Sequence, residues 1–569
     1  MKNKEIAEIF RDIANILEIR GENVFRIRAY TRAAQNIDGL AEDIEVVAKE
    51  NRLHEIPGIG KELAGHIQQF IDTGKIKIYD ELKKSLPRGL VDLLNIPSVG
   101  PKTAKLLFEK AKIKNISDLE NAIKSNKLFG LPGVKEKTVL NIKKGLDILK
   151  RSRGRLPLSF AALLANEVID KLKSLPEVEK ISPAGSLRRQ KESVRDVDIL
   201  VVSSHPEKVM DTFVKMPLVK DILAQGPTKA SIRTKNDTQV DCRVVEDESY
   251  GAALVYFTGS KDFNIKLRKL AIKDGLKVNE YGIYKNDKFL CGKTEEEVFK
   301  KLGMSYVEPE LRENAGEIEL ALKNKLPKLI ELKDLRGDLH AHSNWSDGDS
   351  TIEEMARAAQ DIGLSYIAIT DHSESLKVAN GLSIEELIKK KKEIDVVNKK
   401  LKNFRVLYGT EVDIDSSGKI DYKDEVLKEF DIVVGAIHTG FKQSKEQLTK
   451  RIVKACQNKY VHIISHPTGR LWGVRDAYEI DFEQILKVCR ETNTALEINS
   501  YPDRLDLNDL NARRAKEAGV SISINTDSHR ADQLTNMRFG VAVARRGWLG
   551  REDVINTLEL NDLLRIIKK

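Results

Sequence analysis

Seven short apolar runs alternate with stretches of amphipathic helical spacing in residues 336–569, and this alternation constrains the fold more than any other feature. Alternating strands and helices predict a parallel sheet covered by helices. Seven such units suit a closed barrel of the TIM type with one unit missing. The runs are residues 338–340, 366–370, 405–412, 432–437, 461–465, 495–499 and 520–525.

Histidines and carboxylates follow these runs, at the strand ends where barrels of this type place their active sites. Six of the chain's ten histidines are among them, which chance placement does not readily explain. Mixed imidazole and carboxylate ligands suit Zn²⁺ or Mn²⁺, with Fe²⁺ as an alternative. Nine ligands exceed one site, so we expect two or three ions in a phosphoester-hydrolysing centre. The nine are His340, His342, Asp347, His372, Glu411, His438, His466, Asp527 and His529.

A second candidate site precedes the apolar run at residues 199–202, which is typical of a buried strand. Residues two apart on a strand share a face, so Asp196 and Asp198 present two carboxylates side by side. A second run, residues 239–245, is expected to pair alongside and to supply Asp241. Three hard oxygen ligands suit Mg²⁺, with Mn²⁺ as an alternative. The competing interpretation is a pair of solvated carboxylates at a strand end.

Just upstream, Gly185 and Ser186 predict a tight turn with free N–H groups and a hydroxyl, and Arg188 and Arg189 add positive charge. Beside a Mg²⁺ ion with open positions, these groups would hold a nucleoside triphosphate.

Residues 1–150 are predicted to be helices joined by a repeated hairpin. Residues 56–61 recur as residues 96–102, and a weaker copy, residues 131–137, lacks the second glycine. Glycines allow a tight turn, and the following helix N-terminus exposes N–H groups to a phosphate, which predicts sequence-independent binding of the DNA backbone. The alternative is an ordinary helix-turn-helix corner. The predicted DNA-binding residues are Gly58, Gly60, Lys61, Ser98, Gly100 and Lys102.

Composition adds weaker constraints. A chain of 569 residues is expected to hold several domains, and 96 basic against 87 acidic residues is a mild excess that suits a polyanionic partner. Four scattered cysteines indicate a reducing compartment. The N-terminus opens an amphipathic helix rather than a signal peptide, and no apolar run is long enough to span a bilayer, so we expect a cytoplasmic protein.

The motif of residues 185–198 resembles the nucleotidyltransferase palm of family X DNA polymerases, the family of DNA polymerase beta. Residues 250–315 are similar to the thumb of that family. The resemblance implies that Tyr256 and Phe257 pack on the sugar, that Asn264 reaches the base and that Arg268 faces the template; core packing is the alternative for the two aromatic residues. The implied nucleotide-binding set is Gly185, Ser186, Arg189, Tyr256, Phe257, Gly259, Lys261, Asn264 and Arg268.

The strand-end motifs, among them His-x-His, Thr-Asp-His and Asp-Ser-His, resemble the polymerase and histidinol phosphatase (PHP) domain. The resemblance implies three metal positions. They are held by His340, His342, Glu411 and Asp527; by Glu411, His438 and His466; and by Asp347, His372 and His529. It also makes Arg470 a candidate to clamp the substrate phosphate, a plain surface arginine being the alternative.

Several positions depart from the family pattern, among them Lys261, which stands where the vertebrate enzyme has an acidic residue. His66 and Glu62 stand where beta-type enzymes carry the Schiff-base lysine and a second lysine of the same pocket. Since imidazole does not form a Schiff base as an amine does, lyase activity by that route is not expected. Arg195 replaces a glycine near the triphosphate, and the sequence does not distinguish a phosphate contact from a side chain that points outward.

The predicted fold is multidomain, α+β and α/β. It comprises an N-terminal helix-hairpin-helix domain (1–85), helical fingers (86–150), a nucleotidyltransferase palm (151–245), a small thumb (246–315), a linker (316–335) and a seven-stranded TIM-like PHP barrel (336–569).

The predicted function is a DNA polymerase that fills short gaps in repair, with a 3′-5′ exonuclease or 3′-end-processing site that also suits abasic-site incision. Its predicted partners are gapped or nicked duplex DNA and dNTPs, with no membrane, and the chain is expected to be a monomer. Three alternatives stay open: a hydrolase whose palm only binds DNA, a non-enzymatic DNA-end scaffold, and a phosphatase of small phosphomonoesters.

Overall fold

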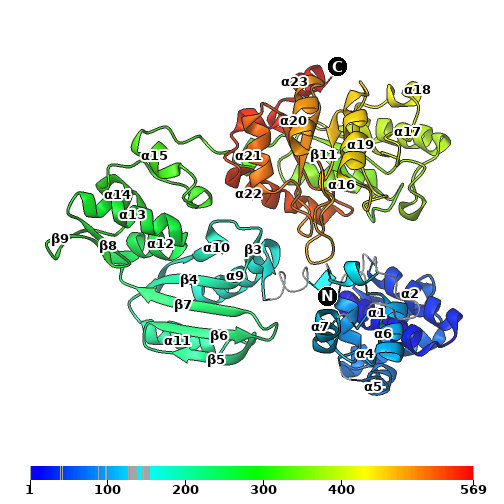
Figure 1. Ribbon diagram of the computed structural model, residues 1–569, viewed down its shortest axis with the longest axis horizontal. Helices are drawn as coiled ribbons and strands as arrows, with labels where there is room; N and C mark the ends of the chain where they lie inside the picture. Colours follow the sequence, from blue (N-terminus) through cyan, green and yellow to red (C-terminus); the bar gives the residue numbers. More distant parts are fainter. Residues whose placement is uncertain are drawn as a thin grey trace. The chain divides into compact units, whose positions relative to one another are not determined.

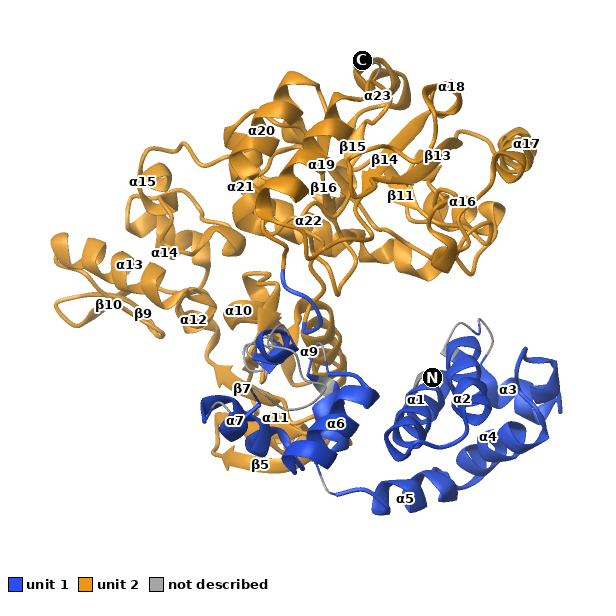
Figure 2. Ribbon diagram, turned by 45° about the vertical axis from the view of Figure 1, so that its right-hand side comes forward, with its two compact units in different colours: residues 1–153, 473–476 blue, residues 154–472, 477–569 orange. Residues whose placement is uncertain are grey.

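The computed structural model describes residues 2–38, 40, 43–87, 89–96, 99–125, 127–128, 138–143, 145–146 and 154–567. Ser98 and the third hairpin copy, residues 131–137, lie outside the described residues. The chain forms two compact units, residues 1–153 with 473–476 and residues 154–472 with 477–569 (Figure 2). None of the described helices is long and apolar enough to cross a membrane.

The first unit is helical in its described part. The amphipathic pattern at the N-terminus forms α1 as predicted, with Ile6, Phe10, Ile13 and Leu17 fully buried. Two hydrophobic clusters fill the unit, one within residues 6–91 and one formed mainly by residues 86–146. The α-helices whose bounds are described in this unit are α1 (Lys2–Arg20), α2 (Val24–Asp38), α3 (Ile44–Lys49), α4 (Lys61–Thr73), α5 (Lys77–Lys84), α6 (Pro101–Ala111) and α7 (Ile116–Lys124).

The palm is a five-stranded sheet in the order β2-β4-β7-β6-β5 (Figure 1). The apolar run at residues 199–202 lies in β4 and is buried. Ile199 and Val201 share a core with apolar side chains of α9 (Leu158–Lys173) and α11 (Pro206–Val214), whereas Leu200 packs with Ala253 and Leu254. A short helix, α10 (Gly185–Arg188), and a small β1–β3 pair precede β4. The strands are β1 (Leu156–Pro157), β2 (Val178–Pro183), β3 (Ser193–Val194), β4 (Asp196–Ser203), β5 (Val219–Gln225), β6 (Lys229–Thr234) and β7 (Gln239–Val245).

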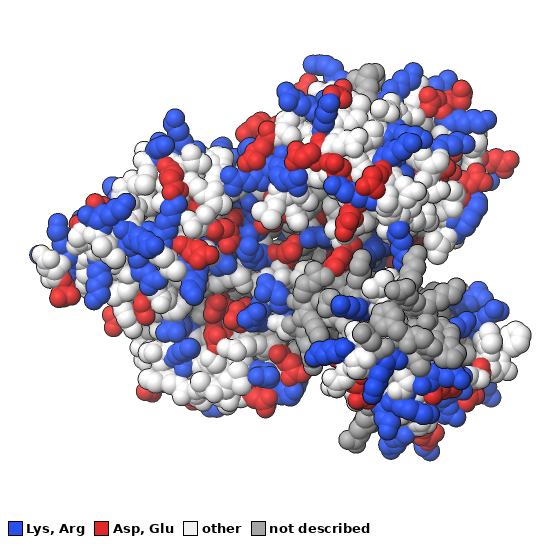
Figure 3. Space-filling model, viewed as in Figure 1, with Lys and Arg blue, Asp and Glu red and all other residues white. Residues whose placement is uncertain are grey.

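The thumb has a core of its own, in which α12, α13 and α14 pack with a three-stranded antiparallel sheet. Its elements are α12 (Tyr250–Thr258), α13 (Lys261–Lys273), β8 (Lys277–Asn279), β9 (Gly282–Lys285), β10 (Lys288–Cys291), α14 (Glu295–Lys301) and α15 (Glu317–Leu322). Lysine and arginine side chains are interspersed with acidic ones on the face in Figure 3, as the mild basic excess implies.

The barrel contains seven parallel strands in chain order, each within or overlapping one predicted run, so the predicted seven-stranded fold is confirmed. The first and last strands are joined by a bridge between Ala341 and Ser528 and by a hydrogen bond from the Leu339 amide to the Asn525 side chain at 3.1 Å. The strands are β11 (Gly337–Ala341), β12 (Tyr366–Ile369), β13 (Arg405–Asp413), β14 (Ile432–Ala436), β15 (Ile463–Ile464), β16 (Ala495–Asn499) and β17 (Ile522–Asn525).

Helices follow these strands and bury apolar side chains in one hydrophobic cluster, except that Leu563 and Ile567 of the last helix lie in a second cluster with strand residues. They are α16 (Ile352–Asp361), α17 (Ile384–Lys400), α18 (Asp424–Leu427), α19 (Lys445–Gln457), α20 (Phe482–Glu491), α21 (Asp509–Glu517), α22 (Met537–Arg546) and α23 (Leu560–Ile567).

Candidate active sites

The palm site is built on two neighbouring parallel strands. β4 carries Asp196 and Asp198, and β7 places Asp241 directly opposite Asp198 in register. All three carboxylates are half-buried. Burial, followed by the negative charges of Asp196 and Asp241, raises the pKa of Asp198 to about 7. Such a group of mutually repelling carboxylates is stabilised by a divalent cation.

At Gly185 the backbone passes so close to these carboxylates that a side chain would not fit. Its φ is +61°, and a Cβ there would collide with the carboxylate of Asp198. Ser186 follows in α10. The palm therefore places the predicted glycine turn against the predicted metal ligands.

The nucleotide-binding residues predicted in the thumb fall into two groups. Tyr256, Asn264 and Arg268 line one small hollow, where the Asn264 amide donates to the Tyr256 carbonyl at 2.7 Å. Phe257 instead faces the palm, with the Arg243 guanidinium 4.5 Å from its ring centre. It lines the hollow that also contains Asp198 and Asp241.

Residues around the start of α13 complete the predicted set. Gly259 lies beside the Arg189 guanidinium, which donates to the Thr258 carbonyl. Lys261, at the start of α13, is exposed, and so is Arg195 in front of β4.

The thumb is fastened to the palm by an ion-pair cluster that the sequence prediction missed. Glu295 receives a bidentate pair from Arg188, at 2.7 and 2.6 Å, and a third bond from Arg312 at 2.7 Å. Burial raises the pKa of Glu295, but the opposing charges of Arg312 and Arg188 outweigh it and lower this pKa to about 2.

The barrel site gathers all nine predicted ligands at the carboxyl ends of the strands. Glu411 lies at its centre, with His372 Nδ1 at 2.9 Å, His466 Nε2 at 3.1 Å and His438 Nε2 at 3.5 Å from its carboxylate. Asp527 faces His342 Nε2 at 3.2 Å. The side chains come from every strand of the barrel except β16.

Three groups of these side chains converge closely enough to hold an ion each. They are His342, Asp347, His372 and His529; His340, His342 and Asp527; and His372, Glu411 and His438. The third predicted set thus comes together whole, with His342 added, and the first comes together without Glu411. In the second, His372 takes the place of His466, although His466 keeps its contact with Glu411.

The donor chemistry of the barrel fits divalent ions. The Nδ1 atoms of His342 and His466 are buried without a hydrogen-bond partner. Burial, with the imidazoles of His529 and His372, lowers the pKa of His342 to about 4, so its ring is neutral as a ligand must be. Burial raises the pKa of Glu411, but the surrounding imidazoles, His340 first, hold it well below the usual range.

Known proteins resemble this chain over its whole length and in its parts. The DNA polymerase/3′-5′ exonuclease PolX of Bacillus subtilis is 39% identical over 573 residues, which cover all of both chains. Family models match residues 1–76 (helix-hairpin-helix domain), 90–147 (SAM-like helix-hairpin-helix tandem), 253–313 (DNA polymerase beta thumb) and 338–501 (PHP domain).

The chain belongs to the family X DNA polymerases. Two relatives match separate parts of it. DNA polymerase lambda of Rattus norvegicus is 24% identical over 55% of the chain and 56% of its own length. A probable phosphatase of Thermoanaerobacter sp. is 32% identical over 39% of the chain and 89% of its own length.

Within this family X chain, several residues that contact the barrel ligands escaped the sequence prediction, among them Glu497 and Arg504. Glu497, on β16, accepts a hydrogen bond from His340 Nδ1 at 2.8 Å and from the His466 amide at 2.8 Å. The Arg504 guanidinium lies 3.3 Å from Asp527. The signal for Glu497 was its place in the one run, residues 495–499, to which no ligand was assigned.

Arg470, the predicted phosphate clamp, is held by other partners. Its guanidinium donates to the carbonyls of Arg504 and Leu505 and pairs with Glu192 of the palm at 2.8 Å. A clamp role for Arg470 stays a prediction and would require these contacts to be exchanged.

The described parts of the first two hairpin copies present open glycines at helix N-termini. Gly60 caps α4 and Gly100 caps α6, and a Cβ added to either would meet no atom within 4 Å. Gly58 has a φ of +80°, which the turn itself requires. Lys61, the first residue of α4, and Lys102, the second residue of α6, are exposed. Both helix ends are therefore accessible to a phosphate.

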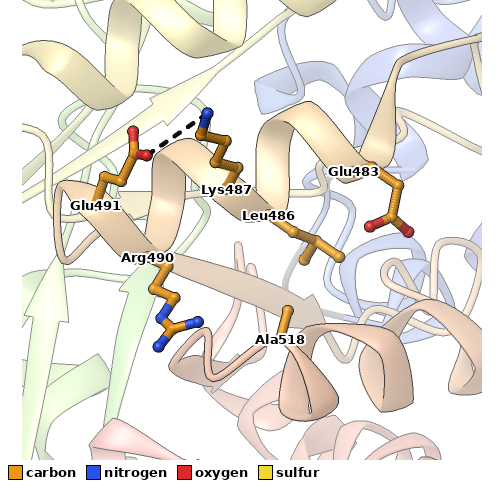
Figure 4. Close-up of a pocket in the computed structure, with 6 residues that line it drawn as sticks. All are labelled: Glu483, Leu486, Lys487, Arg490, Glu491 and Ala518. Atoms are coloured by element: carbon orange, nitrogen blue, oxygen red, sulfur yellow. Dashed lines mark ion pairs between the residues drawn. The ribbon is translucent and has the colours of Figure 1, made fainter.

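A surface hollow of about 490 Å³ lies elsewhere, on the outer helices of the barrel (Figure 4). It is lined by side chains of α20 and by Ala518, among them the Lys487–Glu491 ion pair. No predicted ligand reaches it, so size alone does not mark the active site here.

Proposed function

We propose that this family X polymerase fills short gaps in duplex DNA at the palm, with Asp196, Asp198 and Asp241 as ligands of Mg²⁺. The observation that carries this assignment is the in-register pairing of Asp198 with Asp241, with Gly185 against the same carboxylate. When bound, Mg²⁺ lowers the pKa of the primer 3′-hydroxyl and stabilises the leaving pyrophosphate.

The surrounding residues take the roles of substrate binding. Ser186, Arg189 and Lys261 bind the triphosphate, Tyr256 and Phe257 contact the sugar, Asn264 the base edge and Arg268 the template. The hairpins at Gly60 and Gly100 hold the DNA backbone through helix N-termini. We further propose that dNTPs are the substrates and that the chain is a monomeric cytoplasmic protein. The proposed domain boundaries lie after residues 85, 150, 245, 315 and 335.

We assign 3′-5′ exonuclease and 3′-end processing to the barrel, with Zn²⁺ or Mn²⁺ on the nine ligands. Its three converging ligand groups support more than one ion, and ions so placed generate hydroxide and clamp a phosphate. Abasic-site incision is a further reaction that the same chemistry permits.

Primer extension and 3′ degradation on one gapped duplex test both assignments. Extension should proceed with dNTPs and Mg²⁺ alone, whereas degradation should require Mn²⁺ or Zn²⁺ and should survive brief chelation better, because imidazole ligands hold softer ions more tightly. Degradation that depends on Mg²⁺ alone would contradict the assignment of the barrel metals.

A second function of the barrel, hydrolysis of small phosphomonoesters, is favoured by its similarity to the Thermoanaerobacter protein. Hydrolysis of p-nitrophenyl phosphate tests it. Inhibition by gapped DNA would place DNA ends and the small ester in one site, and insensitivity to DNA would favour a separate phosphatase role.

A further inference from the structure

One buried arginine of the barrel contacts the palm beside the proposed nucleotide-binding residues. Arg546, the last residue of α22, has a side chain only 5% exposed. Its guanidinium donates to the backbone carbonyl of Arg189 at 2.9 Å and to the Glu313 carboxylate at 3.1 Å. On its other side it pairs with Asp509 of α21, at 2.8 and 2.7 Å. The planar fork of arginine is what allows one side chain to bridge these groups.

Arg189 shares that carboxylate. Its Nε lies 3.0 Å from the same Glu313 oxygen, and its Nη1 donates to the carbonyl of Thr258. Lys191 is a third cation near this oxygen, at 3.3 Å. Glu313 of the thumb therefore competes with a triphosphate for Arg189, and Arg546 offsets part of the negative charge with which it does so.

A second barrel arginine holds the other end of the same palm segment. Arg470 pairs with Glu192 at 2.8 Å, and the Glu192 carbonyl accepts from the Leu158 amide at 3.0 Å. Residues 189–192 are thus fixed by the barrel at both ends. Only the Arg546 end touches a residue proposed to bind nucleotide.

We infer that Arg546 is a positioning residue for nucleotide incorporation: it fixes the backbone of Arg189 and shares Glu313, so that the Arg189 guanidinium can engage the triphosphate. This inference rests on the proposed role of Arg189 as a triphosphate ligand. It makes the barrel part of the polymerase machinery as well as the site of a second reaction.

The test is dNTP titration in primer extension on a gapped duplex with Mg²⁺, using the full chain. Arg546→Ala should raise KM for dNTP about tenfold, the loss expected for one hydrogen bond to a charged group, with kcat nearly unchanged. Arg546→Lys should recover part of the loss, because it keeps the charge but lacks the fork. It also carries the test should the alanine variant fail to fold.

Arg545→Ala is the matched control. Arg545 is the preceding residue of α22 and also pairs across the interface, with Glu310 at 2.7 Å and the Ile330 carbonyl at 3.1 Å, but no contact joins it to Arg189. KM should stay within twofold of wild type in this variant. An equal rise in both variants would mean that α22 merely docks the barrel, and the inference would be overturned.

Arg189→Ala separates the inference from the assignment beneath it. If Arg189→Ala raises KM and Arg546→Ala does not, the inference alone fails. If Arg189→Ala leaves KM unchanged, the nucleotide-binding assignment of Arg189 fails and takes the inference with it.

Discussion

The two candidate metal sites of this chain differ in every property that governs how an ion is held. The palm offers three half-buried carboxylates on two strands, whereas the barrel offers nine ligands, six of them imidazoles, most of them buried. Few, hard and accessible ligands leave positions open for substrate phosphates and permit rapid exchange of Mg²⁺. Many mixed ligands suit ions that stay bound. The comparison indicates that one chain separates its two chemistries through the choice of donors.

The surroundings of the ligands differ as well. In the barrel, Glu497 orients His340 and the Asp527 carbonyl lies 2.9 Å from His529 Nδ1. In the palm, the side-chain donor that the described residues offer to the Asp241 carboxylate is the exposed Gln239 amide, at 3.0 and 3.2 Å. Ligands held by a second set of contacts are pre-oriented, whereas those of the palm are free to adjust when metal and nucleotide arrive.

The largest expected effect tests whether the two sites act independently. Asp198→Ala removes a palm ligand and should lower primer extension by at least about 10³-fold while 3′ degradation persists. His342→Ala should do the reverse, because it contributes to two of the three barrel groups. Both activities are measured on the same gapped duplex.

His54→Ala, which alters a histidine of the first unit far in sequence from either ligand set, is the control and should change neither activity. Loss of 3′ degradation in a folded, DNA-bound Asp198→Ala variant would show that the two reactions share one site.

The next effect concerns stability. It compares the ion-pair cluster of Glu295, which anchors the thumb to the palm, with exposed ion pairs on the surface. Glu295→Gln leaves Arg312 and Arg188 buried without their carboxylate, which should cost about 3–5 kcal/mol in the free energy of unfolding at pH 7. Glu353→Gln, which breaks exposed pairs of the barrel, should change it little. Denaturant unfolding of the two variants measures the difference.

The pH dependence of this anchor has a definite sign. The pKa of Glu295 is lowered from 4.5 to about 2 on folding, so its contribution to stability is complete above pH 4.5 and is lost as the pH falls toward 2. The wild type should therefore lose more stability over that interval than Glu295→Gln. If the free energies of unfolding of the wild type and of Glu295→Gln fell in parallel with pH, the Glu295 carboxylate would not stabilise the fold as predicted.

A smaller effect should separate the pre-oriented site from the adjustable one. Glu497→Gln keeps the shape of the side chain but removes the charge that fixes His340, and should weaken metal binding by the barrel about 10–100-fold. Binding is measured by competition with a chelator, independently of activity. Extension by the palm should be unchanged, and Glu491→Gln on the outer surface of the barrel should alter neither quantity.

The sequence predicted those features that depend on neighbours along the chain. Each barrel strand end with a predicted ligand was found because a ligand-type side chain lies within an apolar run or no more than two residues after it, as His372 and His438 do. Asp241 was found because a β-rich run predicts a strand, although its register with Asp198 needed the structure.

The features that the sequence did not reveal depend on residues far apart in the chain. Arg546 and Arg189 are 357 positions apart, and nothing local marks Glu313 as their shared partner. Arg470 was predicted to clamp a phosphate because it lies shortly after His466, but its guanidinium contacts Glu192 of the palm and two backbone carbonyls. Glu497 was not predicted because the local sequence does not show that a buried strand carboxylate will accept a hydrogen bond from a distant histidine.

The smallest effect concerns DNA-backbone binding by the hairpins, on which we expect both reactions to depend. Gly60→Val and Gly100→Val place side chains in the open space before α4 and α6, so folding should be unaffected while a phosphate is kept from the helix N-terminus. Each should weaken binding of gapped DNA by roughly threefold, the loss of about one hydrogen bond, for all sequences alike. Extension and degradation at limiting DNA should fall in parallel. Gly65→Val, equally open but within α4, is the control and should bind DNA normally. A loss confined to particular sequences, or to one of the two activities, would show that the hairpins serve a single site or contact bases rather than the common backbone.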